Sequence, residues 1–122
     1  MGPRNISKEG QMSKARDVQT TLPQVNISTG AVTPGSNGKG LVVGGDFNWY
    51  NPSTTNTCTV STPTDANSKW FVTSDGKNSV AVGPLATQTV TAELESVGLG
   101  WTYGDTCTQS VTDPKIPVGA AM

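Results

Sequence analysis

After residue 40, apolar and polar residues alternate in short runs, which is the pattern of β-strands that bury one face. The clearest run is TQTVTAELE at 87–95, where Val90, Ala92 and Leu94 are predicted to face the core. Gly, Pro, Asn and Asp separate the runs, as expected for turns. The further predicted strands are QVNIS (24–28), LVV (41–43), DFNWYN (46–51), TCTVS (57–61), KWFVTS (69–74), SVAVG (79–83), GWTYGDTC (100–107) and PKIPV (114–118).

The composition favours the same class. The chain has 13 Val and 18 Thr against five Leu, and β-branched residues fit a pleated surface better than a helix. Leu, Ile, Val and Phe together make up only 23 of 122 residues, which predicts a thin core. The net charge of -1 argues against disorder, which usually combines low hydrophobicity with high charge. We therefore predict one folded all-β domain.

The N-terminal part of the chain has a different charge. Residues 1–40 contain five Lys or Arg against two acids, whereas the remainder contains three Lys against seven acids. We divide the chain into a flexible N-terminal arm, residues 1–22, and a β-sandwich domain, residues 23–122. The arm is interpreted either as a solvated tail or as a segment that docks on a neighbouring subunit.

Two cysteines lie in predicted strands, Cys58 on the apolar face of TCTVS and Cys107 at the end of GWTYGDTC. We predict a disulfide between them, because closing a loop of this length can stabilise a domain by about 4 kcal/mol. Two buried free thiols, or a reactive or metal-binding cysteine, are the alternatives. A disulfide predicts an oxidising location, outside the cell or on a particle surface.

The order Cys58, Trp70, Cys107 resembles the Cys…Trp…Cys plan of immunoglobulin-type domains. In that family the bridge joins two sheets and the tryptophan packs on it. The order of FNWYNPSTTNTCTVS, KWFVTS, SVAVGPLATQTVTAEL, GWTYGDTC and PKIPVG is also similar to the cupredoxin layout. Both resemblances imply a Greek-key β-sandwich, which we expect to have about seven strands.

The cupredoxin resemblance does not extend to the metal. A blue-copper site uses two imidazoles and a thiolate, and this chain contains no histidine. Thr57 and Cys58 stand near the expected position of the first histidine, and nothing after Cys107 supplies the second. We predict neither a metal site nor a cofactor.

The same lack of histidine excludes Ser–His and Cys–His catalysis, and we predict that the protein is not an enzyme. The near-zero charge predicts no nucleic-acid binding. No apolar run has the length of a membrane span, so we expect no membrane insertion, and no signal peptide is visible at the N-terminus.

Two functional hypotheses follow. The first is a non-enzymatic extracellular or particle-surface subunit with a structural role, in which an arm or an edge strand pairs with a neighbouring subunit. The second is a binding module for carbohydrate or a surface receptor. If Trp49 and Trp70 face the core, the rings of Tyr50 and Phe71 face the opposite way and would form its binding patch.

Overall fold

The computed structural model describes residues 21–63, 69–107 and 114–121, and these contain strands but no helix. The all-β prediction is confirmed. The strands are β1 (Gln24–Asn26), β2 (Val32–Thr33), β3 (Leu41–Val42), β4 (Asp46–Tyr50), β5 (Cys58–Ser61), β6 (Phe71–Val72), β7 (Ser79–Val82), β8 (Thr87–Ala92), β9 (Gly104–Asp105) and β10 (Val118–Gly119). The described residues thus hold ten strands, whereas we expected about seven. Half of the ten strands are only two residues long, and these short strands raise the number.

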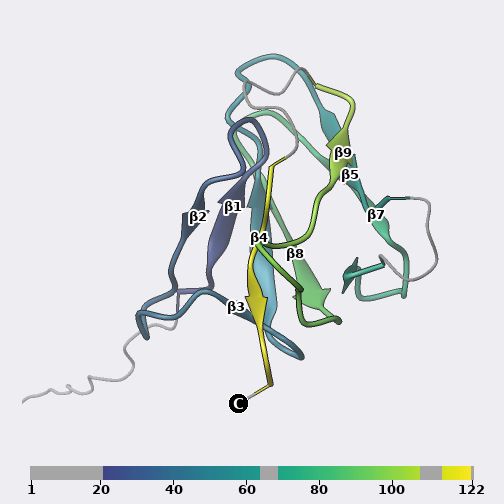
Figure 1. Cartoon of the computed structure of the whole chain (residues 1–122). Coiled ribbons are helices and arrows are strands. Elements are labelled where there is room, and N and C mark those ends of the chain that lie inside the picture. The colour runs from purple at the N-terminus through teal and green to yellow at the C-terminus, as the bar shows by residue number, and fades with distance from the viewer. Residues whose placement is uncertain (1–20, 64–68, 108–113, 122) are drawn as a thin grey trace, which may run out of the picture.

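The strands form three sheets, with the orders β2-β1-β4-β8-β6, β7-β5-β9 and β10-β3 (Figure 1). Strands β4 and β8 form the longest antiparallel pair, in which Asp46 lies opposite Thr91 and Tyr50 opposite Thr87. Strand β1 runs parallel to β4, and β10 runs parallel to β3. Each of these parallel pairs joins segments that are distant in sequence.

One hydrophobic core connects the three sheets. Alternation places Phe47 and Trp49 of β4 and Val90 and Ala92 of β8 on the buried side. The third sheet contributes Cys58, Val60 and Val82. The other buried members are Val25, Ile27, Leu41, Trp70, Phe71, Tyr103, Ile116 and Val118.

Aromatic rings occupy the centre of this core. Trp49 is fully buried, and its ring packs on those of Phe47, Trp70, Phe71 and Tyr103 at centroid distances of 4.7 to 5.7 Å. Each ring removes about 150–250 Å² from water, so a few aromatics compensate for scarce aliphatic residues. The Trp70 indole also donates a hydrogen bond to the Thr102 carbonyl, at 2.9 Å.

The predicted inward row of residues 87–95 is only partly right. Val90 and Ala92 are buried as predicted, but Leu94 is 36% exposed. Strand β8 ends at Ala92, and the Glu93 amide then donates to the Trp70 carbonyl, so the alternation does not continue to Leu94.

The predicted division into an arm, 1–22, and a domain, 23–122, falls mostly at residues outside the described part. Thr21 is described, and it is hydrogen-bonded in both directions to Ser36. Among the described residues, every member of the hydrophobic core lies at residue 25 or later. None of the described residues belongs to a helix that could cross a membrane.

Trp49→Ala is expected to lower the free energy of unfolding by about 3–5 kcal/mol, because it empties the centre of the aromatic cluster. Tyr50→Ala is the matched control, since its half-buried side chain points away from this cluster on the same strand. Urea unfolding followed by circular dichroism measures both. Equal losses for the two variants would contradict the central role of Trp49.

Candidate functional site

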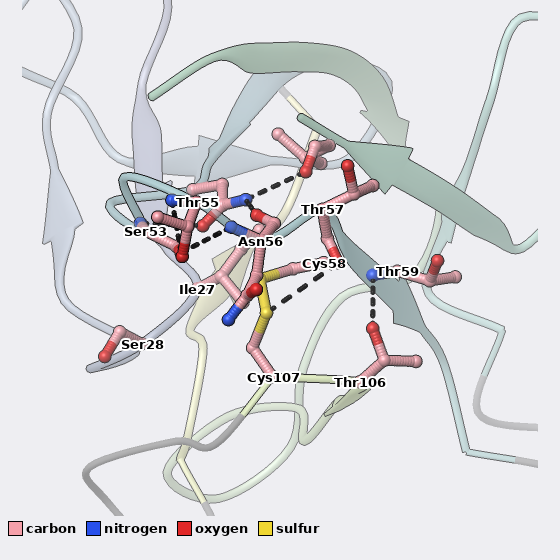
Figure 2. The surroundings of a disulfide bond; sticks show 12 residues. Ile27, Ser28, Ser53, Thr55, Asn56, Thr57, Cys58, Thr59, Thr106 and Cys107 are labelled. Atoms are coloured by element: carbon pink, nitrogen blue, oxygen red, sulfur yellow. Dashed lines mark hydrogen bonds between the residues drawn. A yellow bond between two sulfur atoms is a disulfide. The ribbon is translucent and has the colours of Figure 1, made fainter. Parts of the chain in front are cut away.

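The two cysteines form a disulfide, as predicted, with their Cα atoms 5.3 Å apart. Cys58 begins β5, and Cys107 lies two residues after the end of β9. Strands β5 and β9 are antiparallel neighbours, with Val60 opposite Asp105. Two residues further along the same register, Cys58 stands opposite Cys107. Figure 2 shows the sulfur–sulfur bond between them.

The bridge therefore joins two strands of one sheet. The immunoglobulin resemblance implies a bridge between two sheets, and the structure differs on this point. The physical reason is the pairing of β9 with β5, which brings Cys107 to the edge of the sheet that holds Cys58. The disulfide crosslinks two neighbouring strands of one sheet and does not connect two sheets.

Hydrogen bonds beside the bridge extend this short pairing. The Thr59 amide donates to the Thr106 hydroxyl at 2.9 Å (Figure 2). The Thr106 amide donates to the Thr59 carbonyl at 3.1 Å. Strand β9 has only two residues in the ladder. The disulfide and the Thr59–Thr106 pair thus continue the attachment of β9 to β5.

Asn51 is a buried polar residue that organises the loop before Cys58. Its side-chain amide donates to the carbonyls of Asn56, Val82 and Gly83 at 2.7, 2.9 and 3.2 Å. Its side-chain oxygen accepts from the Ser53 amide at 2.9 Å. A buried amide with all these bonds satisfied fixes the surrounding backbone.

Tyr103 fixes the opposite side of the same region. Its hydroxyl donates to the Ile27 carbonyl at 2.6 Å, which ties the end of β1 to the segment leading into β9. Burial, and secondarily the nearby charge of Asp105, raises the pKa of the Tyr103 phenol. The phenol therefore stays protonated and keeps this hydrogen bond.

A pocket of about 320 Å³ opens between these two anchors, beside the disulfide. Its lining residues come from the end of β1, the loop before β5 and the segment around β9: Ile27, Ser28, Asn51, Pro52, Ser53, Asn56, Cys58, Asp105 and Cys107. Most of its polar groups serve the fold. Asn51 is saturated as described, and the Ser53 hydroxyl accepts from the amides of Thr55 and Asn56.

Asp105 is the one acid among the described residues that line the pocket. Its Oδ2 atom is buried and has no hydrogen-bond partner among the described residues. Burial raises the pKa of this carboxyl, because desolvation disfavours the charged form. The described residues contain no cluster of three metal-ligating side chains.

The predicted binding residues do not form an exposed pair. Tyr50 is half-buried, and Phe71 is fully buried in the aromatic cluster, where its ring packs on those of Trp49 and Trp70. The prediction of an exposed Phe71 ring is wrong because Trp70 precedes β6 and does not share its alternation, so both consecutive aromatics enter the core. The sequence analysis assigned no site role to Asn51 or Asp105, although an asparagine after an apolar run and before proline is a recognisable turn signal.

Comparison of the chain with protein-family models, with curated proteins and with solved structures finds no significant match.

Removal of the disulfide by Cys58→Ala with Cys107→Ala is expected to lower the free energy of unfolding by about 4 kcal/mol, the loop-closure term for this separation. Equilibrium urea unfolding of the variant and of the oxidised protein measures the difference. The control is Thr106→Val, which removes one hydrogen bond beside the bridge and should cost about 1 kcal/mol. If the double-cysteine variant is as stable as the oxidised protein, the disulfide does not stabilise the fold as proposed.

Asp105→Asn is expected to stabilise the domain at pH 7 and to have little effect at pH 3. Because the folded-state pKa of Asp105 is raised, its contribution is favourable only below its unfolded pKa and is lost as the pH rises through the folded value. Asparagine keeps the shape and removes the buried charge. The check is the pH dependence of urea unfolding for variant and parent.

Asp75→Asn is the control, because the pKa of Asp75 is lowered in the folded protein whereas that of Asp105 is raised. The Thr73 hydroxyl lowers the pKa of the exposed Asp75 carboxyl, so its contribution is present above the unfolded pKa and lost in acid. This variant should be no more stable than the parent at pH 7. Two variants that respond identically to pH would show that Asp105 is not desolvated.

Proposed function

We propose that this protein is a non-enzymatic extracellular or particle-surface subunit, a Greek-key β-sandwich that builds an assembly by self-association. The disulfide is compatible with an oxidising environment outside the cell.

The observation that carries the proposal is the open edge of β7. Strand β7 lies at the outside of the sheet β7-β5-β9 (Figure 1). The backbone groups of successive residues in β5 point alternately to its two neighbouring strands. The Thr59 carbonyl accepts from Thr106 on the β9 side, so the backbone groups of Cys58 and Val60 point to β7. There they lie opposite Val82 and Val80. The backbone groups of Ser79 and Ala81 therefore point outward.

Among the described residues, the edge of β7 carries no charge and no proline. Neither Ser79 nor Ala81 has a backbone partner in the described part of the chain. Edge strands usually carry Lys, Pro or a bulge, because an unguarded edge pairs with other chains. An edge left open in this way suits a subunit that receives a strand from a neighbour.

The alternative function, carbohydrate or receptor binding through Tyr50 and Phe71, is not favoured. Phe71 is buried, and the polar groups of Asn51 and Ser53 in the pocket lining bond within the protein. No specific observation supports a ligand at this site.

The oxidised full-length protein is expected to form oligomers whose mass rises with concentration in light scattering and native mass spectrometry. Ala81→Lys should weaken this association, because it places a charge on the edge. Ala120→Lys, which introduces the same charge at another exposed position, is the matched control. A protein that stays monomeric at every concentration would exclude the proposed function.

A further inference from the structure

An apolar loop follows β8 at residues 93–99, ELESVGL, and exposes three large apolar side chains to solvent. Val97 is 76% exposed, Leu99 is 80% exposed and Leu94 is 36% exposed. Single apolar residues on a surface need no explanation, but three within six residues form a patch that is typical of an interaction site.

Hydrogen bonds hold this loop in place on both sides. The Trp101 indole donates to the Leu94 carbonyl at 2.9 Å. The Ser96 amide donates to the Val118 carbonyl at 2.9 Å, and the Val118 amide donates back to the Ser96 hydroxyl at 3.0 Å. The exposure of Val97 and Leu99 is therefore a property of a fixed loop.

Gly100 sets the close approach of the loop to the C-terminal segment. It has a φ of +138°, and an added Cβ would lie 2.5 Å from the Ile116 backbone. Only glycine allows the Trp101 amide to donate to the Ile116 carbonyl, at 2.8 Å, directly after the loop. Gly100 thus fixes the end of the loop against the C-terminal segment.

The charge of the loop restricts what can cover it. Glu93 and Glu95 flank Leu94, both are exposed, and the loop contains no basic residue. If two such loops met face to face, four carboxylates would be brought together, which is unfavourable. The complementary partner is an apolar segment that carries positive charge.

Residues 1–20 of this chain have that composition. They contain Arg4, Lys8, Lys14 and Arg16 against Glu9 and Asp17, a net charge of 4 - 2 = +2. Residues 21–122 contain the other four Lys and seven acids, a net charge of 4 - 7 = -3. Ile6 and Met12 lie between basic residues, and Val18 follows the last of them.

The described chain starts beside the turn before β4. Thr21 lines a shallow hollow together with Gly45 and Asp46. The Gly45 carbonyl accepts from the Ala92 amide at the end of β8, immediately before the loop begins. Twenty residues can span up to about 66 Å when extended, so residues 1–20 can reach a second molecule that meets this end.

We propose that residues 1–20 of one copy dock on the apolar loop, residues 93–99, of a second copy. This inference rests on the proposed self-association and adds to the β7 edge a second contact between copies of the chain. Two copies that meet at this end would exchange segments reciprocally, which gives a closed dimer without a loop-to-loop contact.

The test uses the full-length oxidised protein, with the dimer dissociation constant measured by native mass spectrometry and light scattering. Val97→Ser with Leu99→Ser is expected to weaken the dimer at least about tenfold, because it removes two anchoring side chains. Leu85→Ser is the matched control, since Leu85 is 57% exposed outside the loop and its replacement should leave the constant unchanged.

A second set of variants tests the charge complementarity by exchanging the charges of the two segments. Reversal of the segment by Lys8→Glu, Lys14→Glu and Arg16→Glu should also weaken the dimer about tenfold, and Glu93→Lys with Glu95→Lys in the same chain should restore it. A synthetic peptide of residues 1–20, added in excess to the parent protein, should dissociate the dimer and change Trp101 fluorescence.

The outcomes separate the two proposals. Oligomers that survive both the loop and the charge variants would overturn this inference and leave the proposed function standing. A monomeric parent would overturn self-association itself and, with it, this inference. Loss of association in both sets of variants together with charge-exchange rescue would establish the segment-to-loop contact.

Discussion

The fold depends on the packing of aromatic rings around Trp49. A chain with so few aliphatic residues cannot fill its interior with Leu and Ile, and five rings from β4, the β6 region and Tyr103 fill it instead. The rings also join sheets that the hydrogen-bond ladders leave separate. Tyr103 belongs to the segment that leads into β9, yet its ring packs 4.7 Å from that of Trp49 in the other sheet. Contacts between aromatic rings therefore hold the sheets together.

This division changes the role of the disulfide. Because the rings already connect the layers, the bridge is free to act within one sheet, where β9 has only two ladder residues. Its stabilisation comes from restricting the unfolded chain and holds whichever strands it joins. The consequence is local: β9, Asp105 and the pocket wall keep their place beside β5.

The sequence was informative where alternation was long and uninterrupted. It predicted the all-β class, the burial of Trp49 and Val90, and the pairing of Cys58 with Cys107. It failed at Phe71 and Leu94, where strands of two residues or an early strand end break the period of two. Asn51 could not be ranked above the other asparagines, because its importance arises from carbonyls 31 and 32 residues away. Long-range polar contacts of this kind have no local pattern.

Stability and exposure are linked at the apolar loop. Holding Val97 and Leu99 in water has a free-energy cost that collapse onto the core would relieve, and the bonds of Ser96 and Trp101 prevent that collapse. The same bonds pair two backbone groups of Val118 in β10, the strand that runs parallel to β3. The loop is thus attached to the C-terminal strand. An apolar surface maintained at such cost is explained most simply by a partner that covers it, and the acidic residues beside Leu94 restrict that partner to a basic one.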